Sequence, residues 1–181
     1  MTTPAAPAGH TPDLGVLVGS DGARRRLVVY EDPQCPFCRC FEQRSGDLLS
    51  REVAAGAVAV EYRMRSFLGE ESVRANNALA LAAEEGRFEQ LRREVFASQP
   101  PEHSGGFTPD DLVALGERAG LTSTAYVAGV REGRYEQWVR RTDELLQDED
   151  PDGTPQATLD GAPVDPQVLY EPATLGALLR A

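Results

Sequence analysis

The first third of the chain alternates between apolar patterns typical of strands and of a helix. Residues 14–19 and 25–32 have the pattern of two short strands around a turn, and the second contains a continuous apolar run typical of a buried strand. Apolar positions then recur at helical spacing over residues 35–55, and residues 57–65 return to a strand-like pattern. Strand, helix and strand predict a βαβ unit, with its chemistry at the carboxyl end of the first strand.

The middle of the chain has helical spacing throughout. Residues 70–86 are rich in alanine, and the segment RFEQLRREVF places its apolar residues on one helical face. Residues 107–120 begin with Thr108 as N-cap and Pro109 at the first helical position, and a further helix is expected over 125–132. One more helix in this region has an apolar stripe that is expected to face the core: Tyr135, Trp138, Val139, Leu145 and Leu146.

Strand patterns return near the end of the chain. Residues 155–164 predict two short strands around Asp160-Gly161, a dipeptide that suits a tight hairpin turn, and a helix is expected over about 172–180. The order of elements predicts an α/β sheet whose two halves are separated by a helical insertion. Residues 1–12 are rich in Pro, Ala and Thr and are expected to form a flexible tail.

Composition narrows the class of protein and its partners. With 181 residues and 41% hydrophobic content, the chain can bury one sizeable core. The formal net charge is −11, all the basic residues are arginine, and the acidic run over residues 143–152 would repel a phosphate backbone. We therefore expect no nucleic-acid partner. The sequence does not begin with a basic segment followed by an apolar run, so we expect neither a leader nor a membrane partner. The expected location is therefore the cytoplasm.

All three cysteines lie in the hexapeptide CPFCRC, which begins at Cys35. Cysteines this close together cannot cross-link distant segments, so chemistry is a better reason for them than stability. A thiol in the first turn of a helix is stabilised as a thiolate, and a second thiol three positions later can close a small disulfide with it. Cys35 and Cys38 meet this condition, and Pro36 suits the first helical turn.

Cys40 is expected to point away from this pair, because two residues correspond to about 200° of helical rotation. Two interpretations remain: a small, partly buried side chain, or a regulatory thiol that reacts with Cys38 or with a low-molecular-weight thiol. A zinc site made by the cysteines with His10 or His103 is a further alternative. Because neither histidine has ligand spacing to a second cysteine pair, both are expected at the surface and no metal is expected.

Two separate segments resemble one family. DPQCPFCRCFE resembles the active site of DsbA-like thioredoxin-fold oxidoreductases, which have an acidic residue and a Gln before Cys-Pro-aromatic-Cys. DGTPQATLDGAPV, at 152–164, resembles the same family's Gly-Thr-Pro and following hairpin. The resemblance implies an α/β, thioredoxin-like domain formed by residues 13–64 and 151–181, with an inserted all-helical subdomain at 65–150.

The resemblance also implies roles for individual residues. Cys35 would be the nucleophile and Cys38 the resolving thiol. Pro155 would be a cis-proline beside Cys35, with Thr154 offering backbone groups to an extended substrate.

Pro36 and Phe37, between the two cysteines, would modulate their reactivity. The most oxidising relatives have a histidine where this chain has Phe37, which cannot hydrogen-bond a thiolate, so a milder oxidant is expected. Many relatives also carry a buried carboxylate where this chain has Val29. Glu31, on the same side of the strand, or Asp32 is a candidate proton acceptor in its place.

The implied activity is thiol-disulfide exchange with protein substrates and an unidentified redox partner, by a monomer without metal or organic cofactor. The main alternative is a glutaredoxin-like reduction of mixed disulfides with small thiols. A non-catalytic thioredoxin-like binding module is less consistent with the intact CPFC. In a reducing cytoplasm the pair is expected to rest as a dithiol and act as a reductant.

Overall fold

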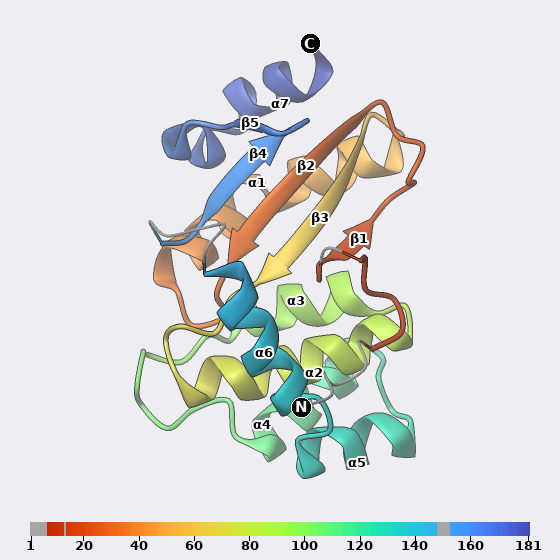
Figure 1. Ribbon diagram of the computed structural model, residues 1–181, viewed down its shortest axis with the longest axis vertical. Helices are drawn as coiled ribbons and strands as arrows, with labels where there is room; N and C mark the ends of the chain where they lie inside the picture. Colours follow the sequence, from red (N-terminus) through yellow and green to blue (C-terminus); the bar gives the residue numbers. More distant parts are fainter. Residues whose placement is uncertain (1–6, 13, 148–152) are drawn as a thin grey trace.

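A five-stranded mixed sheet forms the centre of the computed structural model, which describes residues 7–12, 14–147 and 153–181 (Figure 1). The strands lie in the order β1-β3-β2-β4-β5. Their bounds are Val16–Val18 for β1, Arg25–Glu31 for β2, Val58–Met64 for β3, Gln156–Leu159 for β4 and Ala162–Pro163 for β5. β2 and β3 are parallel, and the other neighbouring pairs are antiparallel.

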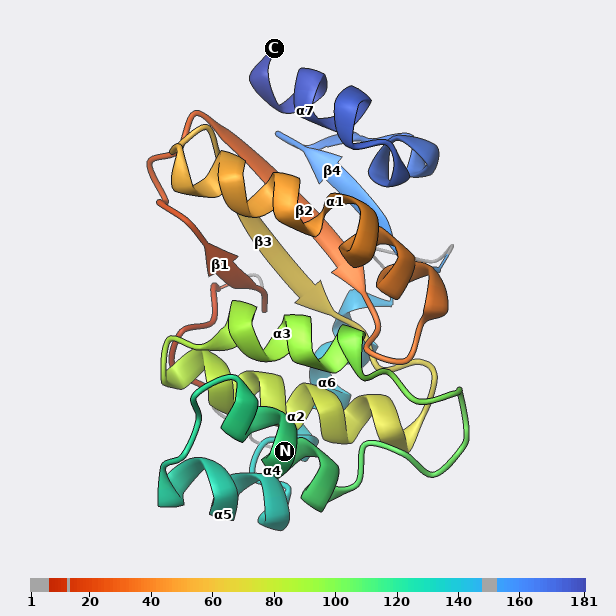
Figure 2. The ribbon, with the colours of Figure 1, turned by 180° about the vertical axis from the view of Figure 1, so that it is seen from behind.

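Helix α1, Pro36–Ala54, connects β2 to β3 and covers one face of the sheet (Figure 2). The predicted βαβ unit is therefore confirmed. Leu27 and Val29 of β2 are fully buried, as a strand with both neighbours paired and a helix above it requires. The final helix α7, Pro172–Arg180, was predicted, whereas the short 3-10 helix η1, Pro166–Tyr170, was not. Both helices contact α1.

The β4–β5 hairpin turns at the dipeptide identified in the sequence. Asp160 and Gly161 both have positive φ, 51° and 84°, which is what a type I′ hairpin turn requires. The Asp160 carboxylate also accepts a hydrogen bond from the backbone N–H of Arg26, at 2.8 Å, and one from the Arg25 side chain, at 2.5 Å. The hairpin is thereby attached to the beginning of β2, which sets the register of β4.

The helical insertion lies beyond the carboxyl ends of β2 and β3 (Figures 1 and 2). Its helices are α2 Glu70–Glu84, α3 Phe88–Ala97, α4 Pro109–Arg118, α5 Thr124–Glu132 and α6 Glu136–Leu146. The predicted start of α4 is confirmed, because Thr108 and Asp111 form a reciprocal capping box with Pro109 at the first position. None of the described helices is long and apolar enough to cross a membrane.

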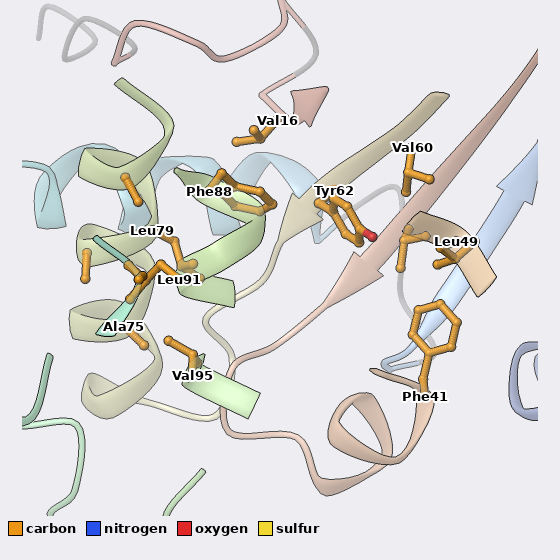
Figure 3. Packing of buried hydrophobic residues seen from close by; sticks show 14 of the residues in the cluster. Val16, Phe41, Leu49, Val60, Tyr62, Ala75, Leu79, Phe88, Leu91 and Val95 are labelled. Carbon is orange, nitrogen blue, oxygen red and sulfur yellow. The ribbon is translucent and has the colours of Figure 1, made fainter. Parts of the chain in front are cut away.

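The insertion and the sheet share one hydrophobic core. Tyr62 of β3 and Phe88 of α3 meet at the junction, with ring centroids 5.6 Å apart (Figure 3). Phe41 and Leu49 of α1 pack on the sheet side of this junction, and Leu91 continues the core into the insertion. The helices are thus joined to the sheet by packing as well as by the chain.

Two expectations about burial were wrong. Residues 7–12 do not form a loose tail: His10 pairs with Val16 through an isolated β-bridge, and its ring lies edge-on to Trp138 at 4.5 Å. Burial lowers the pKa of His10 to about 4. The composition of this segment gave no indication that α6 offers a surface on which His10 packs. Leu145, expected in the apolar stripe of α6, is 42% exposed.

His103 is exposed, as expected. The other half of the predicted tail, residues 1–6, and the predicted domain boundary at 150–151 lie outside the described residues.

Candidate active site

The two cysteines of the predicted pair lie at the beginning of α1, shortly after the end of β2. Cys35 is the N-cap of α1, and Pro36 occupies the first helical position. Cys35 is 5% exposed and Cys38 is fully buried, so only the first sulfur can be reached from solvent. Phe37, between them, is 65% exposed. Both thiols are free in this structure.

The pairing of β2 with β4 brings the second predicted segment to the same place. Tyr30 pairs with Gln156 at the end of the two strands. The Thr154–Pro155 peptide bond, immediately before β4, is cis, and the Cys35 thiol donates a hydrogen bond to the Thr154 carbonyl at 3.3 Å. The structure therefore places Cys35, Cys38, Thr154 and Pro155 together.

The electrostatics of the two thiols differ. A hydrogen bond from the Cys38 thiol lowers the pKa of Cys35 to about 6 against the effect of burial, and Thr154 and the backbone N–H groups of Cys38 and Phe37 act in the same direction. Burial, followed by interactions with Cys35 and the charge of Glu31, raises the pKa of Cys38 well above its ordinary value. At neutral pH the site thus holds mainly a thiolate at Cys35 and a protonated thiol at Cys38, and the hydrogen bond from Cys35 to the Thr154 carbonyl belongs to the protonated form of Cys35.

Thr154 contributes a hydroxyl as well as a carbonyl. Its Oγ1 atom is buried and has no hydrogen-bond partner among the groups that the structure describes. The Thr154 side chain lowers the pKa of both cysteines. Sequence reasoning assigned only the backbone of Thr154 to the site.

We expect the thiolate absorbance of the reduced protein to titrate with a midpoint near pH 6. Because only the thiolate attacks, the rate of exchange should rise about tenfold per pH unit below this midpoint and level off above it. Cys38→Ala removes the main hydrogen-bond donor and should move the midpoint upward, whereas Cys35→Ser should remove it. A wild-type midpoint at the ordinary cysteine value would contradict the thiolate assignment.

Asp32 shapes the loop that leads to Cys35. Its carboxylate accepts hydrogen bonds from the backbone N–H groups of Gln34, at 2.9 Å, and Leu68, at 3.2 Å, and from the Ser72 hydroxyl, at 2.5 Å. Burial raises the pKa of Asp32 to about 7, and the charge of Cys35 adds to the shift. Asp32 therefore lies close enough to the nucleophile to influence it, although its hydrogen bonds serve the loop.

Two glutamine side chains join this loop to the insertion. Gln34 donates to the Leu68 carbonyl and to Ser72, both at 3.2 Å, and accepts from the backbone N–H of His103 at 3.3 Å. Gln99 donates to the carbonyls of Pro33, at 2.7 Å, and Cys35, at 3.0 Å. Gln99 lies in the loop between α3 and α4, and no sequence signal linked it to the cysteines.

Glu31, the other candidate proton acceptor, is fully buried and forms an ion pair with Arg92 of α3, which is 1% exposed. Arg92 Nη2 lies 2.7 Å from Glu31 Oε2, and Arg92 also binds Glu42 of α1 and lies over the Tyr62 ring. Burial raises the pKa of Glu31, and the charge of Arg92 opposes this shift. Strand alternation predicted that Glu31 shares the side of Val29, but it could not identify Arg92 as the partner of Glu31.

Cys40 is partly exposed and does not join the apolar cluster of Cys35, Cys38 and Phe96. Among the described residues, no three His, Cys, Asp or Glu side chains gather in a way that could hold a metal ion. The histidines of the zinc alternative do not lie with the cysteines: His10 packs on Trp138, and His103 reaches the active-site loop only through its backbone.

Comparison with known proteins agrees with this geometry. A family model described as thioredoxin matches residues 12–178. No curated protein matches the sequence.

Solved structures of disulfide oxidoreductases are similar over most of the chain. The reduced form of the disulfide bond oxidoreductase DsbG from Mycobacterium tuberculosis is 26% identical, with a TM-score of 0.79, and the match covers 94% of this chain and 88% of that one. Reduced DsbA from the same organism is also 26% identical, with a TM-score of 0.78 and coverage of 92% and 90%. MdbA, a thiol-disulfide oxidoreductase from Actinomyces oris, has the same fold at 20% identity, with a TM-score of 0.82 and coverage of 96% and 90%.

Proposed function

The chain belongs to the thioredoxin family and is an oxidoreductase of the DsbA type, and from this premise we propose that it exchanges disulfides with protein substrates through Cys35 and Cys38. The observation that carries the proposal is the asymmetry of the two thiols. Cys35 is a slightly exposed thiolate beside Thr154, whereas Cys38 is a fully buried thiol. The first can attack a substrate, and the second is kept neutral until the first has reacted.

The reaction proceeds in two exchanges. The Cys35 thiolate attacks one sulfur of a substrate disulfide, a mixed disulfide forms, and the other substrate sulfur leaves as a thiolate. The Cys38 sulfur then attacks the Cys35 sulfur and the bond from Cys35 to the substrate breaks; the proton of Cys38 is passed to the departing sulfur, which leaves as the second substrate thiol. The substrate gains two electrons and the enzyme closes the Cys35–Cys38 disulfide; substrate oxidation follows the same steps in reverse.

A protein substrate is favoured over a small thiol by the surroundings of Cys35. The Thr154 carbonyl, just before the start of β4, can pair with the backbone of an extended segment, as in recognition by strand addition. Phe37 is exposed beside the sulfur, and Phe67, which immediately precedes Leu68 in the cluster of the cysteines, is 46% exposed. These rings offer apolar contacts that a small thiol cannot use.

We expect the enzyme to reduce a protein disulfide with a kcat/KM about tenfold higher than that for a glutathione mixed disulfide, which corresponds to about 1.4 kcal/mol of added interaction. The two substrates are compared in one assay at the same pH, with the Cys35→Ser protein as the blank. A preference for the glutathione mixed disulfide would instead support the glutaredoxin-like activity.

The direction of catalysis depends on the compartment. The location expected from the sequence is the cytoplasm, where the pair would be kept reduced and would act as a reductant. In an oxidising compartment the same pair would act as an oxidant, and the partly stabilised thiolate of Cys35 favours the reduced form in either case.

A further inference from the structure

A hollow of about 440 Å³ opens beside the nucleophile. Gln34, Pro36 and Arg39 line it from the start of α1, and the loop of residues 99–102 lines it from the insertion. Thr154 is not part of its lining, so it is separate from the strand edge described above. Its size lies in the range of pockets that hold ligands.

Arg39 gives this hollow its charge. The side chain is partly buried and makes no hydrogen bond or ion pair within the described parts of the chain. Elsewhere the surface arginines are commonly paired, as Arg140 is with Glu70 at 2.5 Å and Arg118 with Glu94 at 2.7 Å. A guanidinium without a partner is suited to bind a carboxylate from another molecule, and this local attraction acts against the repulsion that the net charge of −11 exerts on an anion.

The hollow has a fixed position relative to Cys35. The backbone N–H of Arg39 donates to the Cys35 carbonyl at 3.1 Å, and the Gln99 side chain donates to the same carbonyl at 3.0 Å. Both walls are therefore attached to the backbone of the nucleophile. A substrate side chain that enters the hollow while Cys35 attacks must lie close in space to the substrate cysteine, as residues near that cysteine in a short peptide do.

We propose that the hollow binds the Asp or Glu side chain of a protein substrate, near the cysteine that Cys35 attacks, and that Arg39 determines this specificity. The inference rests on the proposed exchange with protein disulfides and adds a preference among them. Glu102 in the loop wall is exposed and acts against it, because its carboxylate repels an acidic side chain. Arg39 and Glu102 thus have opposite effects on the same preference.

The test uses a set of short peptides with one cysteine that carries thionitrobenzoate as the leaving group. Each peptide has Glu at one position within three residues of the cysteine, and a partner peptide has Gln at that position. The second-order rate constant for thionitrobenzoate release is measured for both, and their ratio is the readout. Changes in the reactivity of Cys35 or in the amount of folded protein cancel in this ratio.

At one or more positions the wild-type enzyme should prefer the Glu peptide by about two- to fivefold, the range of a partly exposed ion pair. Arg39→Gln should reduce the ratio to one or below, because the repulsion by Glu102 remains, and Glu102→Gln should increase it. Arg44→Gln is the matched control, because Arg44 is exposed on the same helix outside the hollow, and it should keep the wild-type ratio. Salt should weaken the preference.

The inference is overturned if Arg39→Gln keeps the preference or if Arg44→Gln removes it equally, since the overall field of the protein would then be the cause. A second pair of results also overturns it: the wild-type enzyme shows no preference between the peptides, and Arg39→Gln slows the reaction with glutathione that carries the same leaving group. These results would show that the hollow binds small thiols. Equal reaction with both peptides contradicts this inference alone. Reaction with neither peptide contradicts the proposed function.

Discussion

Replacement of Cys35 by serine should lower the rate of disulfide exchange by on the order of a thousandfold or more. Among the described residues, no other sulfur has a lowered pKa and also lies beside Thr154 with access to solvent. Cys38→Ser should have a different effect. It leaves the first attack possible and removes the resolving thiol, so mixed disulfides between Cys35 and the substrate should accumulate. Steady-state turnover and mass spectrometry of the unreduced adducts measure the two effects.

Cys40→Ser is the control for both variants. Cys40 lies outside the cluster of the reactive pair, so turnover should stay near the wild-type value and no adduct should form on it. Full activity of Cys35→Ser would show that the mechanism is wrong. An adduct or a disulfide found on Cys40 in the wild-type protein would instead support the interpretation of Cys40 as a regulatory thiol.

Replacement of Arg92 by leucine should destabilise the protein by about 3–5 kcal/mol at neutral pH, the cost of leaving a buried charge without its partner. Glu31 would remain fully buried, and burial already raises its pKa with Arg92 present. Without Arg92 the pKa of Glu31 in the folded state rises further. Because a raised pKa in the folded state costs stability as pH increases, the loss should be smallest near pH 4 and larger at pH 7. Denaturant unfolding at several pH values measures it.

Arg93→Leu provides the comparison on the same helix. Arg93 is 39% exposed and pairs loosely with acidic residues at the surface, so its loss should cost less than about 1 kcal/mol. Adding Glu31→Met to Arg92→Leu should recover part of the stability, because no unpaired charge then remains buried. Equal losses for Arg92→Leu and Arg93→Leu would contradict the assigned role of the Glu31–Arg92 pair.

The features predicted well from the sequence are those whose physical cause is local. The helix start at Thr108 and Pro109 and the tight turn at Asp160-Gly161 depend on a few consecutive residues, and both are confirmed. The strand, helix and strand around Cys35 follow from apolar periodicity in the same way. The position of Cys35 at the beginning of a helix was predictable for this reason.

Contacts between distant segments could not be predicted in this way. Nothing near Gln99 indicates that its side chain will reach the Cys35 carbonyl, and nothing near His10 indicates Trp138. Glu31 could be placed on a strand face by alternation, but its partner depends on how α3 packs against the sheet. The pairing of the cysteines with Thr154 was implied by family resemblance and not by any local pattern.

The order of strands in the sheet also bears on synthesis of the chain. The βαβ unit and the whole insertion leave the ribosome before β4, yet β4 is the neighbour of β2 on its other side, with Leu27 paired to Leu159. Throughout that interval β2 has one unpaired edge, and the Cys35 thiol lacks the Thr154 carbonyl to which it later donates. A nascent polypeptide in which β2 has already paired with β3 therefore carries Cys35 beside an open sheet edge, where the thiol is accessible to oxidants and the edge to unwanted strand pairing.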